Sequence, residues 1–317
     1  MKVAFHSHWI TERGSEAAML DYARLNRKIL KNDSILCFPD RPGFAQHPIL
    51  KKWREEFPVI LYSSKFALGA ILEKQGVAVI YMTKPGPYDG FLVPGLKNCV
   101  HAQFLCDEFH GDVYAYLSSW MSREMTGRED SFVPFYIPQF QSAENLRKQL
   151  GIPLEARVFG RHGGWDTFNI PFVRKVVAEH ARNHPWDHFV FLNTRPICGT
   201  ERLANVHYLP VTVDTVEKAR FLATCDAMLH ARWHGETFGL AVGEFAVLGK
   251  PVITFADSRE RAHLEMLGRQ SLQYRHAGEL IKILRDFRPH RTQGTEYEIF
   301  ADPKVVMEIF RKKFLEN

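Results

Sequence analysis

Short apolar runs alternate with helix-like segments through the first part of the chain. Residues 3–8, which begin with three apolar residues, are predicted to form a short buried strand. After a turn at 11–15, the spacing of Ala18, Tyr22 and Leu25 predicts a helix. The alternation continues with strands predicted at 34–38, 59–62, 77–82, 100–104 and 113–117 and a helix at 65–75. Such alternation indicates a parallel sheet covered by helices.

The pattern is interrupted at Pro134 and Pro138 and then starts again. Ser142 is placed to cap a helix that runs to Leu150. The second round has strands predicted at 158–159, 189–192, 227–230 and 252–255 and helices at 172–182, 216–224 and 240–248. The sequence therefore predicts two doubly wound domains with a cleft between them, at 1–138 and 139–300. A last amphipathic helix, in the segment 301–317, is expected to pack back on the first domain.

Length and composition describe a globular protein. The 317 residues are about twice a typical domain, and 45% of them are hydrophobic. No apolar run approaches the ~20 residues that cross a bilayer, and the chain enters a strand at once, without the pattern of a signal peptide. The cysteines lack any C-x-x-C pair, which argues against a disulfide framework or zinc ribbon. A cytoplasmic protein is expected.

The charge is mildly basic, with 41 basic against 36 acidic residues and a net charge of +5. This balance favours anionic ligands without choosing among a nucleotide diphosphate, an acidic lipid surface and nucleic acid. Basic residues come in short bursts at 24–31, 51–54 and 311–313. A solvated helix face explains these bursts, with peripheral membrane contact as the alternative. No nucleic-acid motif or concentrated basic stripe is present, so a nucleic-acid partner is not expected.

The most informative stretch is 230–253, which follows the order strand, glycine-containing loop, helix, glycine stop and strand. The loop residues Phe238, Gly239 and Leu240 would present free amides at a helix N-terminus, an arrangement that suits a phosphate. Gly239 would allow a ligand to approach closely. Glu236 before the helix and Glu244 inside it would accept hydrogen bonds from hydroxyl groups. The alternative is an acidic helix start stabilised by the helix dipole.

This stretch resembles the donor-binding signature of family 4 glycosyltransferases of the GT-B fold. The resemblance rests on Glu236, seven intervening residues and Glu244, with Thr237, Phe238, Gly239 and Leu240 between them and the sequence Gly-Lys-Pro-Val-Ile at 249–253 after them. The glutamate spacing alone is weak, and the flanking residues in their strand-loop-helix context carry the specificity. The resemblance implies two Rossmann-like domains facing across a cleft. It also implies that Glu244 holds ribose hydroxyls and that Glu236 orients the transferred sugar.

Other segments agree with the resemblance in order along the chain. Gly160 and Arg161 resemble the family's Gly-Arg motif, whose arginine pairs with donor phosphates, as a guanidinium fork is suited to do. The lysine that commonly follows in the family is absent from 162–168, so Arg195 or Arg232 would have to help neutralise the diphosphate.

Glycine positions complete the expected donor site. Gly163 and Gly164 follow the strand end and are either a donor loop or a simple turn. Gly14, in the sequence Arg-Gly-Ser-Glu at 13–16, resembles the glycine loop that faces the donor and acceptor, although many relatives have a glycine pair there.

The 15 histidines invite a metal interpretation, which the spacing does not favour. His6 with His8, and His101 with Cys106, Asp107 and His110, lack two paired ligand sets, so no metal site is expected. His101 resembles the family's first-domain histidine that contacts the transferred sugar, and a structural role is the equal alternative. His6, His8 and His110 are expected to be structural or acceptor-side residues.

The resemblance implies a glycosyltransferase that moves a sugar from a nucleotide-diphosphate sugar to a hydroxyl acceptor, such as a glycan, a lipid or a small molecule. Catalysis would use Arg161, Glu236 and His101, need no cofactor and retain the anomeric configuration. A GT-B-like nucleotide-sugar epimerase is the enzymatic alternative. A catalytically silent nucleotide-sugar-binding partner subunit is the alternative from another class, which the complete set of Arg161, Glu236 and Glu244 disfavours.

Overall fold

The computed structural model describes residues 1–11 and 14–316, and these form two compact units. The first contains Met1–Tyr136 and the C-terminal segment from Asp302, and the second contains Ile137–Ala301. The chain thus leaves the first unit once and returns to it for its last helix. The boundaries expected from the sequence, at 138/139 and 300/301, lie within two residues of these positions.

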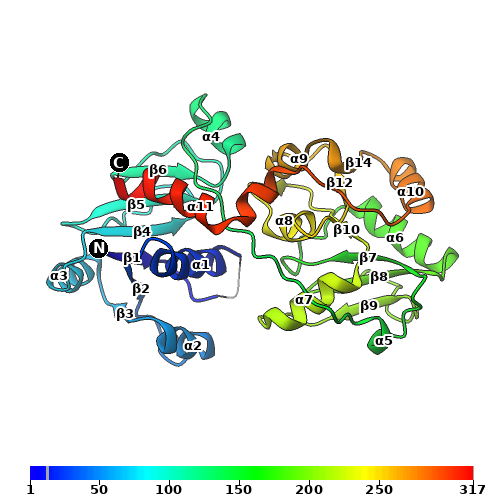
Figure 1. The fold of residues 1–317 in the computed structure, drawn as a ribbon, viewed down its shortest axis with the longest axis horizontal. Coiled ribbons are helices and arrows are strands. Elements are labelled where there is room, and N and C mark those ends of the chain that lie inside the picture. The colour runs from blue at the N-terminus through cyan, green and yellow to red at the C-terminus, as the bar shows by residue number, and fades with distance from the viewer. Residues whose placement is uncertain (12–13, 317) are drawn as a thin grey trace. The chain divides into compact units, whose positions relative to one another are not determined.

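The described part of the first unit contains a parallel sheet of six strands in the order β3-β2-β1-β4-β5-β6 (Figure 1). The strands are β1 (Lys2–His6), β2 (Asp33–Pro39), β3 (Val59–Tyr62), β4 (Val79–Lys84), β5 (Lys97–Ala102) and β6 (Val113–Tyr116). The order changes direction between β1 and β4. Open α/β sheets bind ligands outside the carboxyl ends of the strands at such a switch point.

Helices on this unit bury one apolar face each. They are α1 (Gly14–Lys28), α2 (Pro48–Glu56), α3 (Lys65–Lys74), α4 (Ser119–Thr126) and α11 (Pro303–Phe310), the last followed by the π-helical turn η3 (Arg311–Glu316). The ring of Phe310 on α11 lies 5.0 Å from Tyr22 of α1 and 6.2 Å from Phe5 of β1, centroid to centroid. The C-terminal helix is therefore part of the first unit's core.

The described part of the second unit repeats this arrangement, with the order β14-β12-β10-β7-β8-β9 and the switch point between β10 and β7. Its strands are β7 (Arg157–Arg161), β8 (Asp187–Leu192), β9 (Val206–Leu209), β10 (Ala227–Leu229), β12 (Val252–Phe255) and β14 (Ser271–Tyr274), with β11 (Gly235–Glu236) and β13 (Glu260–Arg261) forming a separate pair. Its helices are α5 (Arg147–Leu150), α6 (Pro171–Asn183), α7 (Thr215–Thr224), α8 (Leu240–Ala246), α9 (Ala262–Leu267) and α10 (Ala277–Asp286), with 3-10 turns η1 (Gly268–Gln270) and η2 (Glu296–Ala301).

The prediction of a helix from Ser142 to Leu150 is wrong over its first half. Ser142 does accept a hydrogen bond from the Glu144 amide, 3.1 Å from its Oγ, but only α5 is helical. The amide of Leu146 instead donates to the hydroxyl of Thr224 on α7 over 2.8 Å. A hydrogen bond to a residue distant in the sequence therefore uses the Leu146 amide, which a longer helix would have used for its own backbone.

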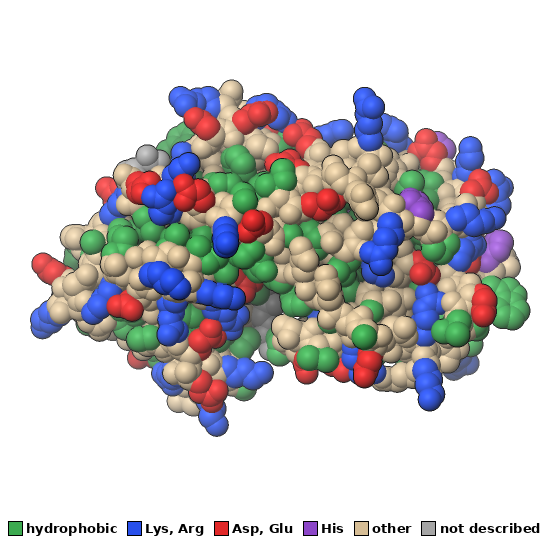
Figure 2. All heavy atoms as spheres, viewed as in Figure 1, with side chains coloured by type: hydrophobic (Ala, Val, Ile, Leu, Met, Phe, Trp, Pro, Cys, Tyr) green, Lys and Arg blue, Asp and Glu red, His purple; other side chains and the backbone are tan. Residues whose placement is uncertain are grey.

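Charged side chains are mixed by sign on the surface. On the face drawn in Figure 2, Lys and Arg side chains lie among Asp and Glu side chains over both units. The basic burst at 51–54 lies on α2, which exposes Lys51, Lys52 and Arg54 and buries Leu50 and Trp53. This is the distribution of a solvated helix face. None of the helices in the described residues is long and apolar enough to cross a membrane.

Candidate functional site

The predicted donor residues come together at the carboxyl ends of β7 and β10, the switch point of the second sheet. Arg161 ends β7, and Glu236 ends the short strand β11, which follows β10 in the chain. The residue after Arg161, His162, places its Nε2 2.9 Å from a carboxylate oxygen of Glu244 on α8. Segments far apart in the sequence thus meet where an open α/β sheet binds its ligand.

Arg161 is buried and holds the loop that follows it. Its Nη1 donates to the carbonyl of Asn193 and the hydroxyl of Thr194 over 3.1 and 2.5 Å, and its Nη2 donates to the carbonyl of Gly164 over 2.8 Å and to the hydroxyl of Thr167. Burial lowers the pKa of Arg161 to about 10, against the opposing effect of Glu236, so the group stays charged at neutral pH. The guanidinium therefore fixes the Gly163–Gly164 loop.

The glycines of this strand end have different roles. Gly160 is enclosed, and a Cβ there would overlap the Cys225 thiol and lie 3.2 Å from the Phe245 ring, so this glycine allows α8 to approach β7 and presents no surface to a ligand. Gly163 has a φ of +141° and accepts a hydrogen bond from the Asn193 side chain, and Gly164 is exposed. Of the three, Gly163 and Gly164 are placed to form a ligand loop.

Glu236 ends a chain of hydrogen bonds through the second unit. Its carboxylate lies 3.2 Å from Nε2 of His230 and 2.7 Å from Nη1 of Arg232. Because a carboxylate only accepts, Nε2 of His230 carries the proton, and Nδ1 accepts from the Thr254 hydroxyl 2.9 Å away. Burial would raise the pKa of Glu236, but the bond from His230 and the charge of Arg232 lower it to about 2. The group is an ionised acceptor beside an oriented imidazole.

Glu244 is buried against two basic groups. Lys218 of α7 pairs with its Oε1, while its Oε2 lies at ion-pair distance from His162 without the alignment of a hydrogen bond. Burial would raise the pKa of Glu244, but Lys218 and His162 together lower it to about 2. Oε2 is a buried acceptor that lacks a hydrogen-bond partner among the described residues. Such an orphaned acceptor fits a ligand hydroxyl.

The loop between the two glutamates is shaped by backbone and core contacts. Gly239 precedes α8 with a φ of +89°, where a Cβ would lie 3.0 Å from the Tyr297 hydroxyl. Phe238 is a core residue, and its carbonyl accepts from that same hydroxyl. Thr237 is also buried, and Leu240 begins α8. These residues set the loop path, and α8 has only seven residues, so its dipole is modest.

Other residues near this edge carry no motif and were not predicted. They are the cation Lys218 and the histidines His162 and His230, with the exposed rings of Trp165 and Trp233. Sequence reasoning missed them because only the fold brings them together, as it brings Lys218 of α7 to Glu244. Arg195, proposed as a substitute cation, is exposed and lies beside Trp165, whose carbonyl accepts from its amide over 2.8 Å.

The structure changes the role predicted for His101 in the first unit. His101 is fully buried, with Nδ1 2.7 Å from the Tyr81 hydroxyl and Nε2 within 3.2 Å of the carbonyls of Tyr116 and Val133. Burial lowers its pKa to about 4. The role of His101 as a sugar-contacting or catalytic residue is therefore corrected to a structural one. Gly14 begins α1, and position 13 of its motif lies outside the described residues.

Chains with known structures resemble this one over nearly the whole length. HepE of Anabaena in complex with UDP-glucose has 15% identity and a TM-score of 0.65, covering 99% of this chain and 95% of that chain. WaaG, a glycosyltransferase involved in lipopolysaccharide biosynthesis, has 14% identity and a TM-score of 0.58, covering 98% and 96%. This chain has the GT-B fold.

Other structures of similar shape carry a different activity. UDP-GlcNAc 2-epimerase from Neisseria meningitidis, bound to UDP-GlcNAc, matches at 13% identity with a TM-score of 0.62 over 100% of both chains. No protein-family profile matches this chain, and no curated protein sequence does either. At these identities the likeness shows the GT-B fold, and the chemistry has to be argued from the residues.

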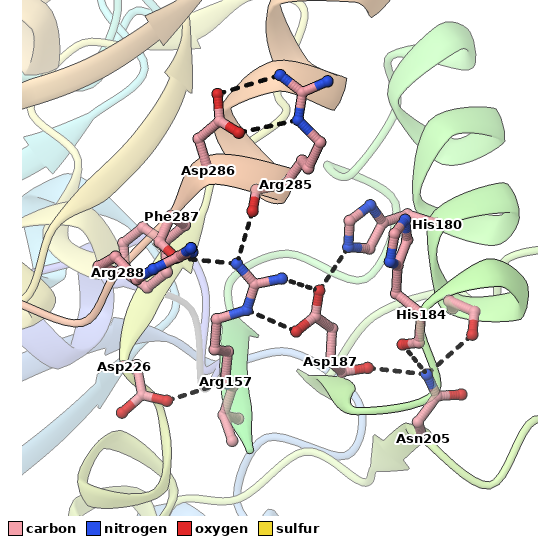
Figure 3. Close-up of polar contacts among 12 residues, drawn as sticks. Arg157, His180, His184, Asp187, Asn205, Asp226, Arg285, Asp286, Phe287 and Arg288 are labelled. Carbon is pink, nitrogen blue, oxygen red and sulfur yellow. Dashed lines mark hydrogen bonds and ion pairs between the residues drawn. The ribbon is translucent and has the colours of Figure 1, made fainter. Parts of the chain in front are cut away.

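A second polar network in this GT-B chain lies at the opposite edge of the second sheet (Figure 3). Asp187 at the start of β8 pairs with Arg157 at the start of β7 and with His180 of α6, both through its Oδ2, over 2.5 and 2.6 Å. Burial would raise the pKa of Asp187, but the bonds from His180 and Arg157 lower it. The same arginine also donates to the carbonyls of Arg285 and Phe287. The network joins β7, β8, α6 and the end of α10, so its role is structural.

Over residues 1–11 and 14–316, no group of three or more His, Cys, Asp or Glu side chains is arranged to hold a metal ion. His6 and His8 do lie together, with ring centroids 4.7 Å apart, but their partners are Tyr62 and Asp89.

Proposed function

We propose that this protein transfers a glycosyl group from a nucleotide-diphosphate sugar to a hydroxyl acceptor. The supporting observation is the meeting of Arg161, Glu236 and Glu244 at the switch point of the second sheet in a chain of the GT-B fold. Similar structures were solved with UDP-glucose and with UDP and glucose, which supports a UDP-sugar as the donor. The second unit would bind the donor, and the first would bind the acceptor.

Each residue has a part in this proposal. Glu244 would accept hydrogen bonds from ribose hydroxyls through Oε2, which faces His162 without an aligned hydrogen bond. Glu236, oriented by His230, would accept from hydroxyls of the transferred sugar. Arg161 would hold the Gly163–Gly164 loop against the diphosphate, and its fixed charge and that of Arg195 would stabilise the charge that develops on the leaving group.

A test of this function is a thermal-shift screen of nucleotide sugars followed by an assay of diphosphate release. We expect a UDP-sugar to raise the melting temperature and its nucleoside diphosphate to be released when a sugar acceptor is added. Stabilisation by none of the nucleotide sugars would contradict the proposal.

Epimerisation is the second candidate, favoured by the likeness to a UDP-GlcNAc 2-epimerase and by the ionisable pair of Glu236 and His230. Incubation of UDP-GlcNAc with the protein distinguishes the two functions. Appearance of the 2-epimer in the proton NMR spectrum, without any acceptor, would identify an epimerase.

We expect the product to keep the anomeric configuration of the donor. This expectation rests on the resemblance to family 4 enzymes, in which the departing phosphate helps to deprotonate the incoming hydroxyl on the same face. With an α-linked donor, the anomeric proton coupling of the product measured by NMR should be that of an α linkage. A β-linked product would show an inverting reaction and require a protein base.

We also expect turnover without an added divalent ion, because arginine and lysine side chains at the site can neutralise a diphosphate. Diphosphate release should stay within about twofold of its original rate after treatment with EDTA. Loss of activity that Mn²⁺ or Zn²⁺ restores would contradict this prediction and revive a metal role for the histidines.

A further inference from the structure

A cluster of charged side chains lies at the switch point of the first sheet. The proposed donor site does not involve it. His8 follows β1, and its Nε2 lies 2.8 Å from Oδ2 of Asp89, in the loop after β4. Lys84, the last residue of β4, donates to Oδ1 of the same carboxylate over 2.6 Å. β1 and β4 are the neighbouring strands at which the sheet order reverses. An open α/β sheet is expected to place a ligand here.

Lys84 is a buried cation within this cluster. Its side chain is fully buried, with the ammonium bonded to Asp89 and to the Phe91 carbonyl over 2.6 Å. Burial lowers the pKa of Lys84, against the effect of Asp89, while hydrogen bonds from His8 and Lys84 overcome burial and hold the pKa of Asp89 well below its usual range. Burying an ammonium is unfavourable unless it is well paired, and here Asp89 and the Phe91 carbonyl pair it. Lys84 thereby fixes the Asp89 carboxylate that orients His8.

The cluster holds His8 in one tautomer. Because the Asp89 carboxylate accepts from Nε2, that nitrogen carries the proton, and Nδ1 of neutral His8 is an acceptor. No partner for Nδ1 is found among the described residues, and about a fifth of the side chain is exposed. The Phe91 ring, 5.0 Å away, fixes the imidazole further. The arrangement presents one oriented acceptor to solvent.

The neighbouring side chains suit a carbohydrate. Trp9 is 56% exposed, with the Arg41 guanidinium 4.4 Å from its ring centroid. A large flat ring beside fixed hydrogen-bonding groups fits a sugar, which has an apolar face and hydroxyl edges. The carboxylate of Asp89 is about a third exposed and offers a second acceptor.

We propose that the His8–Asp89 pair binds the acceptor substrate, with Nδ1 of His8 accepting a hydrogen bond from a hydroxyl of a carbohydrate and Trp9 contacting its apolar face. This inference rests on the proposed glycosyl transfer. In a same-face reaction the proton of the attacking hydroxyl goes to the departing phosphate, so His8 holds the acceptor through a neighbouring hydroxyl. Lys84, which is fully buried and bonded to Asp89, is a positioning residue.

The first test compares His8→Gln with wild type, using the nucleotide sugar found in the thermal screen as donor and maltose and lactose as acceptors. We expect kcat/KM for the acceptor to fall about 10- to 100-fold, with unchanged donor binding by calorimetry and unchanged donor hydrolysis. His290→Gln, at an exposed histidine of the second unit, is the matched control and should behave as wild type. Wild-type acceptor kinetics in His8→Gln would overturn the inference.

A KM-against-kcat split separates this role from a structural one. Because His8 is proposed to hold the acceptor through a neighbouring hydroxyl, His8→Gln should raise KM for the acceptor more than it lowers kcat. A fall in kcat with an unchanged KM for the acceptor would count against His8.

A measurement on the wild type keeps the inference testable if the variants fail to fold or if no donor is found. Long-range proton–nitrogen NMR should show His8 protonated at Nε2 at neutral pH, and maltose should shift its Nδ1 resonance. Asp89→Asn should weaken both features. The opposite tautomer, or an Nδ1 resonance that maltose does not move, would overturn the inference without touching the donor function.

Discussion

Arg161→Ala is expected to abolish most of the turnover, by about 100-fold or more, and to weaken the fold as well. In the proposed reaction the guanidinium stabilises charge that grows on the leaving diphosphate, so kcat should fall more than donor affinity. The same group holds the Gly163–Gly164 loop through four hydrogen bonds to groups of Asn193, Thr194, Gly164 and Thr167. Unpaired buried acceptors would lower the free energy of unfolding by roughly 2–4 kcal/mol.

Steady-state kinetics and urea unfolding together measure these two effects. Arg161→Lys should recover little, because one ammonium cannot replace a planar fork that bonds on two sides. Arg174→Ala is the control, since Arg174 also donates to loop carbonyls, those of Phe168 and Pro196. Full activity of the folded Arg161→Ala protein would transfer the phosphate role to Arg195 or Arg232.

Glu244→Gln is expected to weaken nucleotide-sugar binding by about 1.5 to 3 kcal/mol, because a charged acceptor for ribose hydroxyls becomes a neutral amide. The pKa of Glu244 is lowered to about 2, so the group is ionised throughout the usual assay range, and binding should not follow its titration between about pH 5 and 9. Calorimetry with the best nucleotide sugar measures the change.

The substitution also removes the partner of Lys218 and His162, so its stability has to be measured in parallel. The sign follows from the pKa: a carboxyl group whose pKa is lowered in the folded state contributes stability above its unfolded pKa and loses it as the pH falls toward 2. Wild-type protein should therefore lose part of its stability toward acid that Glu244→Gln does not. Glu217→Gln, which breaks an exposed pair with Arg220 on α7, is the control for donor binding. Unchanged donor affinity in folded Glu244→Gln would remove Glu244 from the site.

Local pattern was sufficient for the two doubly wound units and for the order of strand, loop and helix around Glu236 and Glu244. The buried strand β8 contains the apolar run 189–192, and α6 shows its buried valines at helical spacing. The Glu236 to Glu244 segment could be recognised because glycine, carboxylate and strand-helix signals follow one another in the chain. These features depend on residues that are close together in the chain, so the sequence alone is enough to detect them.

The sequence was a poorer guide to the partners of each charge. It marked Arg161 as a phosphate ligand, whereas the fold surrounds it with acceptors from 164–194, and it weighed His101 as a sugar contact, whereas the strands β4, β5 and β6 enclose it. Burial is a property of packing, and a histidine at a strand end has the same sequence signal whether it faces solvent or the core.

What the sequence by itself determined is the order of elements, the two doubly wound units and the segment that carries Glu236 and Glu244. Only the tertiary structure decided which side chains meet: Lys218 at Glu244, His230 at Glu236, and His8 with Asp89 and Lys84 at the first switch point. The physical reason is sequence separation, since His8 and Asp89 are 81 positions apart along the chain, and only the pairing of β1 with β4 brings them within hydrogen-bond distance.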